Sequence, residues 1–331
     1  MSISRRTFLE SATLAGLLAH PAAAFEKDAK TGMPMRVLGK TGAKVSLLGF
    51  GSGSRWLMYK EEDKAAEALY TALDAGVNYV DSAQSYGDGE SERRLGLFLG
   101  ERRKQVWLVT KIPDRTHDGL LRAFEQCLGR LRTDHVDLLH MHSLTTEEDL
   151  AKILAPNGAL KALYKLRDEK SARHIGVTCH SDPAVLKTLI EEADLDCTQM
   201  ALNAGRMGSG KPSNVRGYSP SFEEIALPAA LKKKMGVTAM KVYAQDKLLP
   251  DGKPADLVRY AMSLPVASAV IGMPKLEYLN ENVQFAKSFR PMTKRDMKRI
   301  SDQLAAVKKA EIDAYFHQHQ DACDACGVQL A

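Results

Sequence analysis

Short hydrophobic segments rich in Val, Ile and Leu alternate with amphipathic segments along most of this 331-residue chain. The hydrophobic segments lack a clean period of two, which is typical of strands buried on both faces of a parallel sheet. The strand candidates are residues 45–50, 77–81, 106–111, 136–141, 174–178, 197–202, 237–243 and 268–272. The helix candidates are residues 62–75, 90–101, 117–131, 158–169, 182–194, 221–234, 254–263 and 275–287.

Eight strand–helix pairs in succession predict an α/β protein with the (β/α)8 architecture, a TIM barrel. An open, doubly wound sheet is the alternative, and it usually has a Gly-x-Gly-x-x-Gly turn after its first strand. The corresponding turn here, residues 49–54, reads Gly-Phe-Gly-Ser-Gly-Ser and has a different spacing. The pattern therefore favours the barrel.

Three segments are additional to the eight pairs. Residues 34–44 are predicted to form an N-terminal hairpin that closes the bottom of the barrel. Residues 204–220 are rich in Gly, Ser and Pro and are expected to form a long loop at the ligand-binding end. Residues 293–317 have a charged helical pattern. We thus expect a barrel over residues 25–290 and, over 291–331, a C-terminal extension with a helix and a Cys-x-x-Cys tail.

Residues 1–24 have the form of a bacterial export signal rather than of a folded element. They contain the pair Arg5-Arg6, an apolar stretch from Ala12 to Ala19, and a small-residue end at Ala24. The apolar stretch is about half as long as a membrane-spanning helix. We expect cleavage after Ala24 and a periplasmic mature chain without a membrane span. The twin-arginine route is known to carry folded proteins, so we expect the protein to close around its ligand before export.

Charge and cysteine content narrow the range of partners. The formal net charge is +5, and no run of Lys and Arg exceeds three residues, so nucleic-acid binding is not expected. Cys127, Cys179 and Cys197 fall within predicted strands and helices and are expected to be buried as small apolar side chains. Cys323 and Cys326 in the tail are open to three interpretations: a disulfide, two free thiols, or a zinc site with two nearby histidines.

Four polar residues follow three neighbouring predicted strands. Asp81 ends the second strand and Tyr86 lies in the loop after it, while Lys111 ends the third strand and His142 follows the fourth. The carboxyl ends of all strands in a parallel barrel point to the same mouth. We therefore expect these four side chains to converge there.

These four residue types together suit the reduction of a carbonyl group. A phenol with a pKa near 10 is a weak acid at neutral pH, and an ammonium group close by lowers the pKa of tyrosine. A carboxylate holds the lysine charged and oriented, and a histidine can donate a hydrogen bond to the substrate oxygen. None of these side chains supplies a hydride, so the site implies a nicotinamide cofactor.

The same residues give the chain a resemblance to the aldo-keto reductase superfamily over nearly the whole mature length. The matching segments are residues 38–42 with 45–46, residues 81–87 with 91–92, Lys111, and residues 137–142. The resemblance implies that Tyr86 is the general acid, that Lys111 and Asp81 tune it, and that His142 orients the carbonyl of a small-molecule substrate. It also implies NADP(H) as the cofactor.

The resemblance places further residues at the nicotinamide end of the cofactor site. Gln199 matches the residue that holds the carboxamide. Thr178 and Cys179 stand where the family has a Ser-Asn pair, and Cys179 cannot replace an amide. Met240 stands where the family stacks an aromatic residue on the nicotinamide, and a thioether can pack there.

At the adenine end, Glu281 and Asn282 match the family. Tyr278 replaces an arginine that would bind the 2′-phosphate, and Gly272 replaces a lysine, although Lys275 can supply a charge. NADP(H) is therefore expected because the family usually binds it, and NAD(H) remains an alternative.

Three other functions remain as alternatives. His140 and His142 lie on one strand face, as zinc ligands do in metal-dependent barrel hydrolases; we prefer to place His140 one layer below the site, hydrogen-bonded in the barrel, with no metal. Lys111 could form a Schiff base in an aldolase. A non-catalytic, cofactor-binding redox partner is the third alternative, because free NADPH is not expected outside the cytoplasm.

Overall fold

The computed structural model describes residues 24–206, 221–246 and 248–304. The export signal, most of the loop predicted over 204–220, and the Cys323–Cys326 pair lie outside the described residues. No helix within the described ranges is long and apolar enough to cross a membrane.

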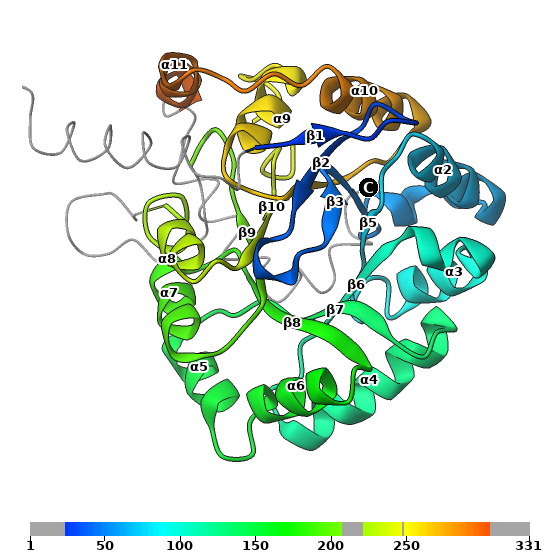
Figure 1. Cartoon of the computed structure of the whole chain (residues 1–331), viewed down its shortest axis with the longest axis vertical. Helices are drawn as coiled ribbons and strands as arrows, with labels where there is room; N and C mark the ends of the chain where they lie inside the picture. Colours follow the sequence, from blue (N-terminus) through cyan, green and yellow to red (C-terminus); the bar gives the residue numbers. More distant parts are fainter. Residues whose placement is uncertain (1–23, 207–220, 247, 305–331) are drawn as a thin grey trace, which may run out of the picture.

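The predicted (β/α)8 barrel is confirmed. Eight parallel strands close on themselves, each hydrogen-bonded to the next in chain order and the last to the first. They are β4 (Leu48–Gly51), β5 (Tyr79–Asp81), β6 (Trp107–Ile112), β7 (Val136–Met141), β8 (Ala172–Cys179), β9 (Cys197–Ala201), β10 (Gly236–Met240) and β11 (Ser268–Gly272). Figure 1 looks along the barrel and shows the helices as a ring around these strands.

At least one helix follows each strand and packs its apolar face on the barrel, and two helices follow β7. The barrel helices are α2 (Glu62–Asp74), α3 (Glu90–Phe98), α4 (His117–Leu131), α5 (Glu147–Leu154), α6 (Ala159–Asp168), α7 (Pro183–Glu192), α8 (Ala226–Lys232), α9 (Pro254–Ser263) and α10 (Leu276–Lys287). Local sequence sets several starts. Thr116 caps α4 by accepting from Gly119 N, and Asp182 caps α7 just before Pro183.

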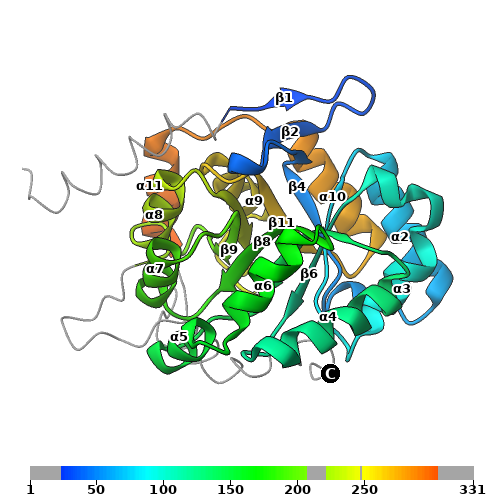
Figure 2. The ribbon, with the colours of Figure 1, turned by 60° about the horizontal axis from the view of Figure 1, so that its bottom comes forward.

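A three-stranded antiparallel sheet covers the amino-terminal end of the barrel and includes the hairpin predicted over residues 34–44. Its strands are β1 (Glu26–Lys27), β2 (Pro34–Val37) and β3 (Lys44–Ser46), and the short 3-10 helix η2 spans Gly39–Thr41. Figure 2 shows this sheet at one end of the molecule. Gly39 has φ +50, and a Cβ there would lie 2.2 Å from Gly236 N, so only glycine allows this close approach.

Several predicted boundaries were wrong. The candidate strand 45–50 is two elements, because β3 ends at Ser46 in the covering sheet and β4 begins at Leu48 in the barrel. The candidate strand 237–243 ends at Met240, and Lys241 has φ +58, which breaks the extended backbone. The candidate helix 221–234 is regular only over Ala226–Lys232, since the Ser221 backbone and hydroxyl both bond Glu224 in a preceding turn.

Helix α5 was not predicted, and helix α11 (Lys294–Leu304) is the described part of the segment predicted over 293–317. Met297, Ile300 and Leu304 form the buried face of α11, and Ser301 Oγ donates to Ala204 O at 2.9 Å. The short helices η3 (Trp56–Met58) and η4 (Gly100–Gln105) complete the described elements.

The three cysteines predicted to be buried are buried and free: Cys127, Cys179 and Cys197. Burial raises the pKa of all three thiols, that of Cys179 to about 11. Such thiols stay protonated at neutral pH and act as packing groups rather than nucleophiles.

Candidate active site

An ion pair lies at the carboxyl ends of β5 and β6. Lys111 Nζ is 2.7 Å from Asp81 Oδ2 and also donates to Ser82 O at 2.7 Å. Both side chains are almost fully buried. These two bonds hold the ammonium group in place. They also offset the cost of burying its charge, since a buried charge is tolerated only when it is paired and hydrogen-bonded.

The same ammonium group contacts the tyrosine of the following loop. Lys111 Nζ donates to Tyr86 Oη at 3.2 Å and lies 4.7 Å from the centre of the Tyr86 ring. The His142 ring stands edge-on to that ring, with centroids 5.9 Å apart. Its Nδ1 is 3.3 Å from Ser85 Oγ. The four residues singled out from the sequence are therefore brought together.

Asp81 is held from a second side. Gln199 Nε2, from β9 on the opposite wall, donates to Asp81 Oδ1 at 3.2 Å. Burial raises the pKa of the Asp81 carboxyl, while the Lys111 charge and the hydrogen bonds from Lys111 and Gln199 oppose that rise. Both carboxylate oxygens thus have a donor inside the barrel.

A pocket opens above these residues at the mouth of the barrel. It contains about 910 Å³ of empty space, the solvent in its opening included. Its walls come from β4, β5 and β7 to β11 and from the loops that follow them, and the lining residues are Gly51, Gly53, Ser54, Arg55, Asp81, Tyr86, His142, Thr178, His180, Gln199, Met240, Lys241, Val242, Tyr243, Gln245, Asp246, Val270, Ile271 and Gly272.

The family model described as Aldo/keto reductase family matches residues 47–248, more than half of the chain. The chain belongs to the aldo/keto reductase family. Among its relatives, an uncharacterized oxidoreductase of Bacillus subtilis is 26% identical over an alignment of 315 residues that covers 81% of this chain and 95% of the relative. A pyridoxal 4-dehydrogenase of Microbacterium luteolum is 28% identical over an alignment of 251 residues that covers 63% of this chain and 70% of that enzyme.

Solved aldo-keto reductases share the fold of this chain. The holo form of an aldo-keto reductase from Bacillus halodurans superposes with a TM-score of 0.67 at 22% identity, covering 82% of this chain and 96% of that chain. An aldo/keto reductase from Klebsiella pneumoniae, in complex with NADP and acetate, gives 0.62 at 21% identity, covering 80% and 94%.

The cofactor residues expected of this reductase divide into two groups. Thr178, Gln199, Met240 and Gly272 line the pocket. Lys275, Glu281 and Asn282 are not part of its lining: Lys275 is the exposed residue before α10, and Glu281 is exposed on that helix. Asn282 is buried and accepts a 2.7 Å hydrogen bond from the hydroxyl of Tyr243, which itself lines the pocket.

Among the lining residues that were not proposed as site residues from the sequence are three with large polar side chains: Arg55, His180 and Tyr243. Each comes shortly after the end of a barrel strand, the position from which side chains reach the mouth. The Gly-rich turn before Arg55 was considered only as a nucleotide motif. For Arg55 and His180, a place shortly after a predicted strand was the signal that could have found them, whereas Tyr243 was assigned to the predicted strand 237–243 itself.

The expected hydrogen bonding of His140 was wrong. Its ring is fully buried two residues before His142, but neither ring nitrogen has a hydrogen-bond partner among the described residues. Burial lowers the pKa of His140 well below its usual value, and the charges of Lys111 and His142 act in the same direction. The ring is therefore neutral and acts as a filler of the barrel interior.

A zinc site at His140 and His142 gains no support from the geometry. Within the ranges that the structure describes, no three His, Cys, Asp or Glu side chains gather closely enough to hold a metal ion. A catalytic zinc site takes three protein ligands in addition to water.

Proposed function

We propose that this protein reduces an aldehyde or ketone to an alcohol with NADP(H), with Tyr86 as the general acid. The observation that carries the proposal is the position of Lys111 Nζ, between Asp81 Oδ2 at 2.7 Å and Tyr86 Oη at 3.2 Å. A cation next to the phenol oxygen stabilises the phenolate left after the proton is given to substrate. Asp81 keeps that cation charged in a buried site.

His142 completes the proposed reaction by orienting the substrate. Its ring lies beside the Tyr86 ring and lines the pocket, so an N–H of His142 and the phenol of Tyr86 can reach the same substrate oxygen. Two donors at one oxygen polarise the carbonyl and stabilise the negative charge that develops on it.

The residues of the pocket fit a nicotinamide nucleotide. Gln199 and Thr178 are buried polar groups on the wall opposite Asp81, and Met240 offers a thioether for packing on a ring. Arg55 and Lys241 put cations on the lining, where phosphates would bind. The nucleotide supplies the hydride. We infer NADP(H) rather than NAD(H) from the complexes of structural relatives with NADP and NADPH.

We also propose that the protein works in the periplasm after twin-arginine export and cleavage after Ala24. The sequence of residues 1–24 supports this. Because free NADPH is not expected there, we infer that the cofactor is acquired before export and is regenerated by a redox partner.

Replacing Tyr86 tests the proposed reaction. Tyr86→Phe removes the proton donor alone, so we expect reduction of 4-nitrobenzaldehyde with NADPH to fall by about a hundredfold or more, as loss of a general acid does. Nucleotide affinity, measured by calorimetry, should stay close to that of the wild type. Tyr70→Phe is the matched control, because Tyr70 Oη donates to Phe98 O outside the barrel. Normal turnover by Tyr86→Phe would show that Tyr86 is not the acid.

A further inference from the structure

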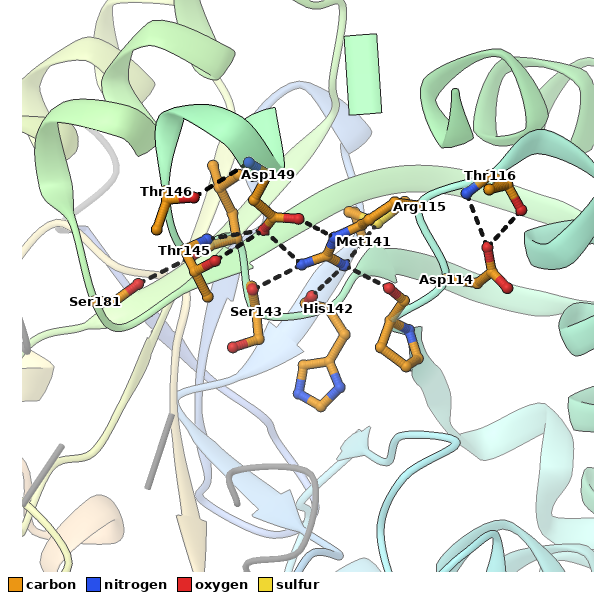
Figure 3. Close-up of polar contacts among 12 residues, drawn as sticks. Asp114, Arg115, Thr116, Met141, His142, Ser143, Thr145, Thr146, Asp149 and Ser181 are labelled. Atoms are coloured by element: carbon orange, nitrogen blue, oxygen red, sulfur yellow. Dashed lines mark hydrogen bonds and ion pairs between the residues drawn. The ribbon is translucent and has the colours of Figure 1, made fainter. Parts of the chain in front are cut away.

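Arg115 lies at the centre of a polar network at the carboxyl end of β7 (Figure 3). It belongs to the loop between β6 and α4, but its guanidinium group reaches the next strand. Nη1 donates to His142 O at 2.7 Å, and Nη2 donates to Ser143 O at 2.8 Å. Nη1 also donates to Pro113 O at 2.8 Å in its own loop. The Arg115 side chain thus links the loop after β6 to the end of β7 at His142.

Asp149, on α5, fixes the guanidinium group from the other side. Arg115 Nε is 2.6 Å from Asp149 Oδ1 and Nη2 is 2.8 Å from Oδ2, a two-point contact that sets the plane of the group. The Arg115 and Asp149 side chains are only 15% and 14% exposed. The carboxylate is itself held, because Thr145 N donates to Oδ2 at 3.0 Å.

The backbone that this pair holds has an unfavourable conformation. Ser143 has φ +56, in the left-handed region, which is strained for a residue other than glycine. In this conformation Ser143 N donates to Thr178 Oγ1 at 2.8 Å, and Ser143 Oγ lies 3.3 Å from His180 Nε2. The turn therefore sets three groups of the pocket at once: the rings of His142 and His180 and the hydroxyl of Thr178.

Since the carbonyls of residues 142 and 143 both accept from Arg115, loss of the guanidinium group would free the turn that aims the His142 ring. In Figure 3 that ring points away from the guanidinium group. The ring also lies 3.3 Å from Ser85 Oγ and edge-on to the Tyr86 ring. The backbone turn sets the direction from which the ring reaches these contacts.

We propose that Arg115 and Asp149 are positioning residues that act on the reaction through His142. This rests on the proposed function, in which His142 donates to the substrate oxygen. Arg115 does not itself line the pocket, and its bonds to the lining reach it through the carbonyls of His142 and Ser143. An error of about 1 Å in such a donor is enough to slow a reaction by about a hundredfold.

The chain offers a matched control at the other end of the barrel. Arg103 Nη1 is 2.9 Å from Asp137 Oδ2, and the side chain also donates to Val106 O at 3.0 Å and His135 O at 3.2 Å. It is 16% exposed, as buried as Arg115. Arg103 thus makes the same kinds of bond, but at the amino-terminal ends of β6 and β7, away from the mouth.

The decisive experiment is a double-mutant cycle on kcat for 4-nitrobenzaldehyde with NADPH. Arg115→Gln and Arg103→Gln are each made in the wild type and in His142→Ala. If Arg115 acts through His142, Arg115→Gln lowers kcat at least about tenfold in the wild type and less than about twofold in His142→Ala. Arg103→Gln should change kcat by the same small factor in both. An equal loss for Arg115→Gln in both backgrounds would overturn the proposal.

Conservative variants separate positioning from folding. Arg115→Lys keeps the charge but cannot span two carbonyls and Asp149 together, so it should recover only part of kcat. Asp149→Asn keeps the shape of the partner and should show the same dependence on His142. If Arg115→Gln does not fold, the cycle of Asp149→Asn with His142→Ala decides the question.

A readout independent of activity keeps this proposal separate from the proposed function. In protein with 15N-labelled histidine, the ring signals of His142 are those that His142→Ala removes. Arg115→Gln should shift these signals, and Arg103→Gln should leave them in place. Unmoved His142 signals in Arg115→Gln would overturn the positioning role. A wild type without carbonyl reduction would instead overturn the proposed function, and the histidine signals would still show whether Arg115 places the ring.

Discussion

At the scale of single residues, Lys111 and His140 show how the same burial gives opposite charge states. Their Cα positions are paired across β6 and β7, and both side chains are almost fully buried. Lys111 has Asp81 and a carbonyl as partners and can remain an ammonium ion. His140 has no such partner, and the nearby Lys111 charge further disfavours its protonation. Partners, rather than depth, decide which group carries charge.

The neutral state of His140 predicts a loss of stability in acid. In the unfolded chain a histidine takes up a proton near pH 6.5, but burial holds the pKa of His140 well below that value in the fold. Below about pH 6.5 the unfolded state therefore binds a proton at this histidine that the folded state does not bind. The free energy of unfolding should fall by up to about 1.4 kcal/mol per pH unit from this residue.

The measurement is denaturant unfolding of the wild type and His140→Met at several pH values. Above pH 7 the free energies of unfolding of the two proteins should change with pH in parallel. Below about pH 6.5 that of the wild type should fall more steeply, by the slope that one additional bound proton in the unfolded state gives. Equal slopes in acid would contradict a neutral, buried His140.

Residue identities at the mouth could be predicted because strand ends in a barrel must converge. Asp81, Lys111 and His142 each end or follow a strand, so topology alone brought them together. The hydrogen bonds could not be predicted in the same way. The bond of Gln199 to Asp81 and the two-carbonyl contact of Arg115 join residues far apart in sequence, and their geometry depends on strand register and rotamers.

At the scale of elements, packing between neighbouring strands depends on small residues as much as on apolar ones. Gly176 in β8 faces β9 and the His140 ring. A Cβ there would lie 2.5 Å from Cys197 O and 2.6 Å from His140 Nδ1. The backbone oxygen of a barrel strand cannot move aside, so the ring of His140 fits only because this position has no side chain.

Gly176→Ala should therefore destabilise the fold by about 1–3 kcal/mol or more, through overpacking of the barrel interior. Gly129→Ala, on the exposed face of α4, has nothing within 4 Å of the new Cβ. It should raise stability by about 1 kcal/mol, as Gly→Ala does within a helix. Urea unfolding of both variants provides the comparison, and a stabilised Gly176→Ala would contradict the close packing.

Element boundaries show where reasoning from sequence stops. Helix α5 was missed, although Thr146 with three acidic residues after it forms a good helix start and Thr146 accepts from Asp149 N. The eight-pair pattern left no place for an extra helix, so this local signal was passed over. The split of β3 from β4 depends on the sheet to which each segment pairs, which hydrophobicity does not encode.

At the scale of the whole molecule, the two ends of the barrel have separate roles. The three-stranded sheet covers the amino-terminal end, where Leu38 and Val45 pack with Tyr79 and Leu138. The pocket occupies the other end. A ligand bound in the pocket adds contacts between many strands and loops and should stabilise the fold as a unit.

Bound nucleotide should accordingly raise the melting temperature of a chain that lacks residues 1–24, the segment proposed to be cleaved. At a concentration of about 100 Kd the gain is about 2.7 kcal/mol. Protein first stripped of nucleotide should melt at a lower temperature, with NADP restoring more of the loss than NAD at equal concentration. Mass analysis of the nucleotide that copurifies with the protein checks the same preference. An equal gain from NAD and NADP would contradict it.

The hydrogen bond from Gln199 to Asp81 crosses the barrel from the wall proposed to hold the cofactor to the residues proposed to move the proton. That bond lowers the pKa of Asp81 against the effect of burial. Any occupant that draws the amide away from the carboxylate must therefore increase the affinity of Asp81 for a proton. By thermodynamic linkage the influence runs both ways, and proton uptake at Asp81 alters the affinity for that occupant by the same factor. The affinity for an occupant that competes for Gln199 and the protonation of Asp81 are consequently coupled, and a substitution at Gln199 should change both.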